Sequence, residues 1–148
     1  MQPNTSGQDI WQFNRAVTSR LMGINIANLM IGQRLMLRDG FWRGVGVQAA
    51  GWAFINLMIA LVGGTLTNRR LDSLDQPFEP EVMRKEARNL RRLLWINTGL
   101  DVFYMLGGWR FARQRGRNKP LMRGMGIGIV IQGALLFVFD LFHARRVP

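Results

Sequence analysis

Three segments of the chain are almost free of charged side chains. Residues 44–68 and residues 124–139 carry no charge, and residues 93–109 carry a single one, Asp101. A helix needs about 20 mostly apolar residues to cross a bilayer, at about 1.5 Å per residue. The first segment has this length, and the other two reach it when the flanking arginine side chains extend to the interface. The pattern therefore predicts three membrane-spanning helices.

A fourth candidate span is the uncharged segment 21–33. It reaches spanning length when it is extended to residues 16–37, with an arginine inside each end. Its apolar residues lie all round a helix, which favours a span, because an interfacial amphipathic helix carries them along one stripe. We therefore expect four spans, at about 16–37, 44–66, 93–109 and 121–143. Three spans with one surface helix are the alternative.

The connection between the second and third spans, residues 69–92, has the pattern of an amphipathic helix. Apolar residues recur at helical spacing from Val82 to Leu94, and Pro80 suits the first helical turn. We expect this helix to lie at the membrane surface or to run straight into the third span. The predicted fold is all-α, an integral membrane bundle of four transmembrane helices with an amphipathic side helix between spans 2 and 3.

A single membrane domain is expected over the whole chain, residues 1–148. Residues 1–15 form a polar tail without the basic start and apolar core of a secretory signal, and residues 110–120 form a basic loop. Aromatic residues next to the span ends, including Trp11 and Phe13, are expected at the membrane–water interface, where amphipathic rings prefer to lie.

Composition removes several kinds of chemistry. The chain is 48% hydrophobic, which excludes a disordered protein. It has no cysteine and one histidine, which exclude disulfides, iron–sulfur clusters, thiol catalysis and multi-histidine metal sites within one copy. The serines, Ser6, Ser19 and Ser73, lie outside the apolar runs, which disfavours a serine hydrolase. We therefore expect no cofactor and no bound metal, and we lean against an enzyme.

Basic side chains outnumber acidic ones by 20 to 9, and the spans divide them between two sides of the membrane. Side A, with the start of the chain, residues 69–92 and the C-terminal residues, has 11 Lys and Arg residues. Side B, with residues 34–43 and 110–123, has 9 of them. Lys and Arg in short loops mark the cytoplasmic side. Because the side-B loops are shorter and denser in charge, we expect side B in the cytoplasm and a multi-pass protein of the bacterial inner membrane.

The last of these loops is the most densely basic part of the chain. As an orientation signal it marks the cytoplasmic side, and as a binding surface it holds anionic head groups of membrane lipids. No aromatic stacking platform or recognition helix accompanies the charges, so we expect membrane lipid and no nucleic acid as a partner. The residues concerned are Arg110, Arg113, Arg115, Arg117, Lys119 and Arg123.

Polar and ionisable side chains occur inside all four predicted spans. They are Asn25, Asn56, Asn97, Asp101, Gln132, Asp140 and His143. In the third span Asn97, Asp101 and Tyr104 lie at i, i+4 and i+7 on one helix face, and the polar residues of the fourth span share a face as well. Such groups are expected to point into the bundle, because an ionisable side chain that faces lipid costs several kcal/mol.

Two interpretations of this polar cluster are open. In the first, amides and acids bond across helices and fix the packing, each bond contributing about 0.6–2 kcal/mol. The protein is then a structural or accessory subunit, in a homo-oligomer or a larger membrane complex. In the second, Asp101, Asp140 and His143 form the proton or cation site of a small coupled transporter, with His143 as the one side chain of near-neutral reference pKa. The amides favour the first interpretation, which we prefer, and Asp101 near mid-membrane favours the second.

Seven residues of the third and fourth spans form a further pattern. They are Asn97, Gly99, Asp101, Tyr104, Gly133, Asp140 and His143. With these residues the chain resembles a family of small bacterial four-span membrane proteins of unknown function. The resemblance covers residues 93–146, agrees more loosely at 23–32 and leaves out the basic loop. It implies a membrane bundle and no particular activity, cofactor or substrate.

Overall fold

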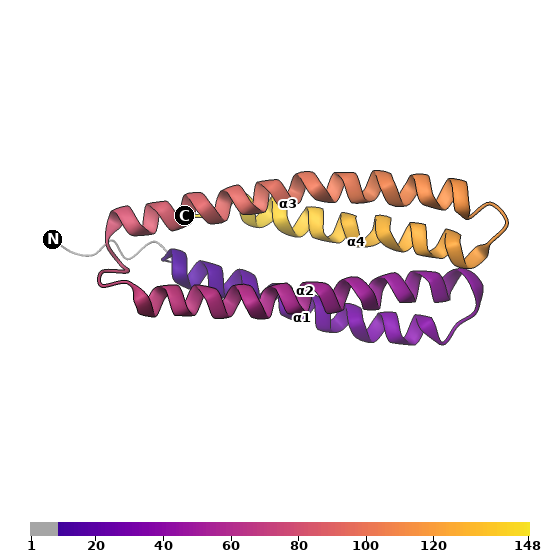
Figure 1. Ribbon diagram of the computed structural model, residues 1–148, viewed down its shortest axis with the longest axis horizontal. Helices are drawn as coiled ribbons and strands as arrows, with labels where there is room; N and C mark the ends of the chain where they lie inside the picture. Colours follow the sequence, from indigo (N-terminus) through magenta and orange to yellow (C-terminus); the bar gives the residue numbers. More distant parts are fainter. Residues whose placement is uncertain (1–8) are drawn as a thin grey trace.

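The computed structural model describes residues 9–148, which form four α-helices and, in this range, no strand. The helices are α1 (Ile10–Met36), α2 (Gly40–Ser73), α3 (Pro80–Arg115) and α4 (Pro120–Ala144). They lie side by side in an elongated bundle (Figure 1). The α1–α2 and α3–α4 turns lie at one end, the side-B end, and the α2–α3 connection lies at the other, the side-A end. The prediction of an all-α fold with four helices is confirmed.

Two of the helices are much longer than the predicted spans. α2 has 34 residues and α3 has 36, which correspond to about 51 and 54 Å. Of the two arrangements expected for the amphipathic segment, the structure has the one in which it runs straight into the next predicted span, because residues 80–92 begin α3, while residues 69–73 end α2. The physical reason is that Pro80, in the first turn, is the last proline before Pro120, so no helix breaker separates the amphipathic segment from the apolar one.

An apolar core, here called the side-A core, closes the side-A end of the bundle. α1 begins at Ile10, six residues before the predicted first span, and residues 1–8 lie outside the described part of the chain. Trp11 and Phe13 are buried in the core. Trp11 Nε1 donates a hydrogen bond to the Pro77 carbonyl oxygen at 3.0 Å, which ties α1 to the α2–α3 connection. The buried residues of this core are Ile10, Trp11, Phe13, Val17, Ala87, Leu94, Phe139, Ala144 and Val147.

Glycines bring α2 and α4 into backbone contact at the side-B end. A Cβ atom on Gly124 would overlap the carbonyl oxygen of Phe41, and one on Gly44 would overlap that of Leu121. The two helices therefore approach with no side chain between their backbones, as small residues allow in helix packing. This approach joins the α1–α2 hairpin to the α3–α4 hairpin.

The first helix is capped by a side chain. The Asp9 carboxylate accepts a hydrogen bond from the backbone N–H of Gln12 at 2.8 Å, which satisfies one of the free N–H groups of the first turn. We expect Asp9→Ala to lower the free energy of unfolding by about 1 kcal/mol, and Asp9→Asn, which keeps an accepting oxygen, to lower it less. Thermal unfolding followed by circular dichroism measures both effects. An unchanged midpoint for Asp9→Ala would contradict this cap.

Candidate functional site

The middle of the bundle is polar inside and apolar outside. Large apolar side chains are exposed on all four helices, for example Ile31 (56% exposed), Ile59 (60%), Phe103 (72%) and Val138 (65%). A water-soluble bundle has the opposite arrangement, with the apolar face of each helix buried. The buried polar side chains are Asn25, Asn56, Thr98, Asp101, Gln132, Asp140 and His143.

Two helices, α2 and α4, are long and apolar enough to cross a membrane by their length and composition. Core helices of soluble proteins pass the same criterion, so on its own this is a weak hint of membrane association. By this criterion, two of the four predicted spans, the second and the fourth, are supported.

Amide side chains form two pairs between helices in the interior. The Asn56 side-chain N–H on α2 donates to the Asn25 side-chain oxygen on α1 at 3.2 Å, and Asn25 donates to the Leu21 carbonyl oxygen at 2.8 Å. About one turn further along α1, Asn28 and Gln132 of α4 donate to each other, Gln132 to Asn28 at 3.2 Å. The first pair joins the two helices of a hairpin, and the second joins the two hairpins.

Asn28 is missing from the set of polar residues predicted from the sequence. It follows Asn25 by three residues, so the two side chains share a helix face, and this spacing is the signal that would have identified it. Its partner Gln132 was predicted, and it is buried on α4. Through its two hydrogen bonds with Gln132 of α4, Asn28 connects α1 to the other hairpin.

The inward face of α3 differs by one residue from the predicted Asn97–Asp101–Tyr104 face. Thr98 is buried and its hydroxyl donates to the Leu94 carbonyl oxygen at 2.8 Å, whereas Asn97 is only half-buried. Tyr104 is partly exposed, and its ring meets the Trp52 ring of α2 edge to face with 4.9 Å between centroids. Asp101 is the member of the predicted face that points fully inward.

Two carboxyl groups are buried between α3 and α4. Asp101 is 3% exposed and Asp140 is 7% exposed. Asp101 Oδ2 is buried and has no hydrogen-bond partner within residues 9–148. The α4 backbone passes close by at Gly133, where a Cβ would lie 3.1 Å from the Asp101 carbonyl oxygen. Because an unpaired buried carboxylate is unfavourable, packing alone explains the amides but does not explain Asp101.

His143 lies at the side-A end and is held by two contacts. Its Nδ1 is 2.7 Å from the Phe139 carbonyl oxygen, and its Nε2 is 3.3 Å from an Nη of Arg20 on α1. A carbonyl oxygen only accepts, so Nδ1 carries the hydrogen, and Nε2 of the neutral ring accepts from the guanidinium. His143 therefore contacts Arg20, and within residues 9–148 no hydrogen bond joins it to Asp101 or Asp140.

The part of the chain that the structure describes has no group of three or more His, Asp or Glu side chains placed to hold a metal ion. Asp101 and Asp140 are thus two buried carboxyl groups on neighbouring helices, and within residues 9–148 no hydrogen bond joins them.

The basic residues of the α3–α4 turn line two depressions. The larger, here called the arginine groove, has a volume of about 830 Å³ and includes Trp109, Arg113, Arg117, Arg123 and Ile127 in its lining. The smaller, of about 640 Å³, shares Arg117 and is lined by Arg115 and Lys119 as well. Arg110 is exposed on α3 and lines neither depression. The structure thus divides the predicted basic set between two faces of one turn.

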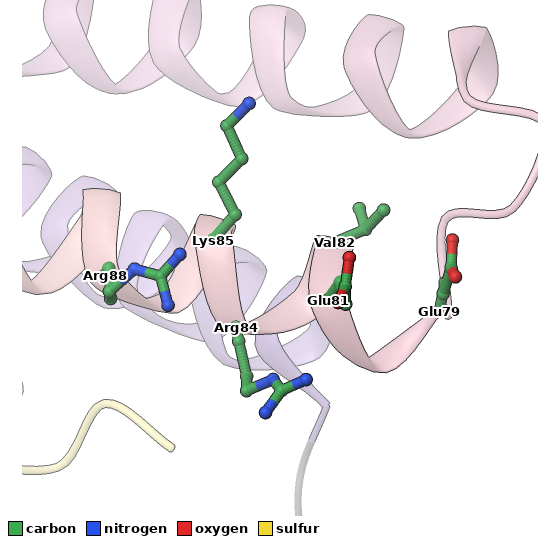
Figure 2. Close-up of a pocket in the computed structure, with 6 residues that line it drawn as sticks. All are labelled: Glu79, Glu81, Val82, Arg84, Lys85 and Arg88. Carbon is green, nitrogen blue, oxygen red and sulfur yellow. The ribbon is translucent and has the colours of Figure 1, made fainter.

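A third depression, of about 510 Å³, lies at the start of α3. It is lined by Glu79, Glu81, Val82, Arg84, Lys85 and Arg88. Figure 2 shows that its basic side chains do not converge, since Lys85 and Arg84 point to opposite sides of the helix. Both signs of charge occur in its lining, so it is not a one-sign binding surface.

The fold and the interior define a class of protein, an all-α bundle of four helices with a polar interior and an apolar exterior. A model of a family described as a family of unknown function (DUF6992) matches residues 20–141, and the chain belongs to this family. The prediction of membership in an uncharacterised family is thereby confirmed. The match includes the basic loop, which lies outside the resemblance seen in the sequence. No curated protein and no solved structure matches the chain.

Proposed function

We propose that the chain is a four-span protein of the bacterial inner membrane and acts as a structural or accessory subunit, in a homo-oligomer or a larger complex. The observation that carries this proposal is the inverted arrangement of side chains. Apolar residues are exposed on all four helices, while amides and acids are buried between them. Lipid solvates the first group and excludes the second, whereas water would do the reverse.

Inward-facing polar residues contribute to the low mean hydropathy of α1 and α3, together with arginines near the span ends. Asn25 and Asn28 lower the mean hydropathy of α1, and Asp101 lowers that of α3, although large apolar residues such as Ile31 and Phe103 face outward. Mean hydropathy treats both faces alike, so it underrates a helix whose polar residues are shielded from lipid. In the orientation that we propose, the short basic turns at the side-B end lie in the cytoplasm.

The amide pairs support a structural role. In lipid, helices are held together by close packing and interhelical hydrogen bonds, because apolar surface gains nothing by leaving a hydrocarbon solvent. The bond between Asn25 and Asn56 and the reciprocal pair of Asn28 and Gln132 supply such hydrogen bonds within and between the hairpins. A subunit of this kind needs no reactive group.

The test of the membrane assignment is extraction of native membranes with alkaline carbonate and then with mild detergent. We expect the protein to stay in the carbonate-washed membranes and to enter detergent solution. Affinity purification from that solution, with mass spectrometry, then identifies a stoichiometric partner or a homo-oligomer. Release by carbonate would contradict the four spans, and a monomer without a partner would contradict the accessory role.

A second candidate function, a small proton- or cation-coupled transporter, is favoured by one observation. Asp101 Oδ2 is buried without a hydrogen-bond partner within residues 9–148, and a second buried acid, Asp140, lies on the neighbouring helix α4. An amide at this position would pack as well without the penalty of a buried charge, so retention of an acid favours chemistry. His143, which contacts Arg20, is not required for this version of the site.

For the transporter we predict proton flux in liposomes that falls to background in Asp101→Asn. The variant keeps the size of the side chain and removes its titratable group, so its folding is expected to be unchanged. Asp39→Asn, at an exposed acid of the α1–α2 turn, is the matched control and is expected to retain full flux. Absence of flux in the unmodified protein under every ion gradient tested would exclude the transporter and leave the structural role.

A further inference from the structure

We propose that the arginine groove binds the phosphate head group of an anionic membrane phospholipid, with an acyl chain of that lipid lying along Trp109 and Ile127. The proposal rests on the membrane location given above and adds a ligand to it. Its basis is the juxtaposition of three guanidinium groups and an apolar wall in one groove of about 830 Å³.

The charge of the groove is of one sign. Arg113, Arg117 and Arg123 line it, and no acidic residue occurs anywhere between Asp101 and Asp140. Within residues 9–148 the ion pair that forms is Arg70–Glu86, at the opposite end of the bundle. The guanidinium groups of the groove are therefore available to an external anion, and the planar guanidinium matches the oxygens of a phosphate in a bidentate arrangement.

The apolar wall of the groove distinguishes a lipid from a free anion. Trp109 is 50% exposed, and the Arg113 guanidinium lies 5.1 Å from the centre of its ring, so a cation and an aromatic face border the same space. About one helical turn from Trp109 and Ile127, toward the middle of the bundle, lie the exposed apolar residues Leu106 on α3 and Ile131 on α4. A phosphate with an attached acyl chain fits both parts, whereas inorganic phosphate fits only the first.

The turn that forms the groove is tightly packed. Gly116, which ends α3, is buried, and a Cβ on it would lie 2.7 Å from the Cα of Arg123. The backbones of the two helix ends therefore fix the spacing of the arginines on either side. A site whose cations are already positioned loses less conformational freedom on binding.

The depression at the start of α3 provides a matched control. It also carries three basic residues, Arg84, Lys85 and Arg88, but Glu79 and Glu81 lie beside them and the side chains diverge (Figure 2). Its one apolar lining residue is Val82. By the same argument it should not hold an anionic lipid, although the number of positive charges is equal.

The experiment is native mass spectrometry of the detergent-solubilised protein after incubation with phosphatidylglycerol or phosphatidylcholine. We expect retained phosphatidylglycerol adducts that fall by about tenfold or more in the triple variant Arg113→Gln, Arg117→Gln, Arg123→Gln. The control triple variant Arg84→Gln, Lys85→Gln, Arg88→Gln is expected to retain the adducts. Replacement of the three groove arginines by lysine is expected to give intermediate retention, because charge is kept and the bidentate geometry is lost.

Three outcomes would overturn the proposal. They are equal retention of the two lipids, equal loss in the two triple variants, and full displacement of the lipid by millimolar inorganic phosphate, which would assign the site to a free anion. All of these are measured in detergent, so they do not depend on orientation in the membrane. Failure of the membrane assignment is detected separately by carbonate extraction, and circular dichroism of each variant reports its folding.

Discussion

Gly124→Val is expected to separate α4 from α2 and to destabilise the bundle by about 3 kcal/mol or more. The new side chain would have to occupy the position of the Phe41 carbonyl oxygen. This atom belongs to the backbone of the neighbouring helix, so no rotation of a side chain relieves the overlap. The free energy of unfolding, measured by titration with a denaturing detergent and tryptophan fluorescence, reports the loss.

Gly51→Val is the control for this prediction. Gly51 lies on α2, and a Cβ there would meet no atom within 4 Å. Valine has a slightly better helix propensity than glycine, so the expected change is within about 0.5 kcal/mol. If both variants lose the same stability, the cause is the valine itself, and the close approach of α2 and α4 does not determine the stability of the bundle.

The second large effect is expected at the amide pair that joins the hairpins. Gln132→Leu leaves the Asn28 side-chain oxygen without its partner and leaves the Asn28 N–H with only the longer bond, 3.5 Å, to the Ala49 carbonyl oxygen. We expect a loss of about 1–3 kcal/mol. The double variant Asn28→Leu, Gln132→Leu removes both amides, and most of the loss should be recovered because no unsatisfied group remains. The same unfolding titration measures both variants.

The double-mutant cycle isolates the energy of this pair. A coupling of about 0.6–2 kcal/mol is expected for an interhelical hydrogen bond in a membrane. Gln33→Leu, at an exposed amide of α1, is the control for replacing an amide by leucine and should change stability little. Additive losses for Asn28 and Gln132 would show that the pair does not fix the packing of the hairpins.

The sequence predicts four helices correctly because charge and hydropathy are properties of whole segments. Even the first segment, which has the weakest pattern, is identified as a helix from its run of uncharged and mostly apolar residues. The inward residues of α3 are harder to predict. Asn97 and Thr98 are neighbours about 100° apart, and which of them faces the interior depends on the position of α4, which a single helix does not specify.

The lengths of α2 and α3 could not be predicted from the span criterion. That criterion asks for about 20 residues and gives no information on how far a helix continues beyond the hydrocarbon. Because the criterion ends each helix at the hydrocarbon, it leaves no protein surface on which Trp11 could be buried. In the structure the extended helices provide that surface, and Trp11 is buried in the side-A core. The unpaired Oδ2 of Asp101 is a property of the folded arrangement, because a sequence pattern identifies a polar residue but not its partner.

The side-A core makes the stability of the two parts of the molecule depend differently on temperature. In the four-span arrangement that we propose, most of this core lies where α2 and α3 extend past the length of a span, so unfolding would expose apolar residues such as Trp11 to water. Exposure of that kind raises the heat capacity, and its contribution weakens on cooling and in urea. In the same proposed arrangement, the helices within lipid have no such term, because their apolar faces meet hydrocarbon in both states. Cold and urea should then loosen the contact of α1 with the α2–α3 connection while the close approach of α2 and α4 stays intact.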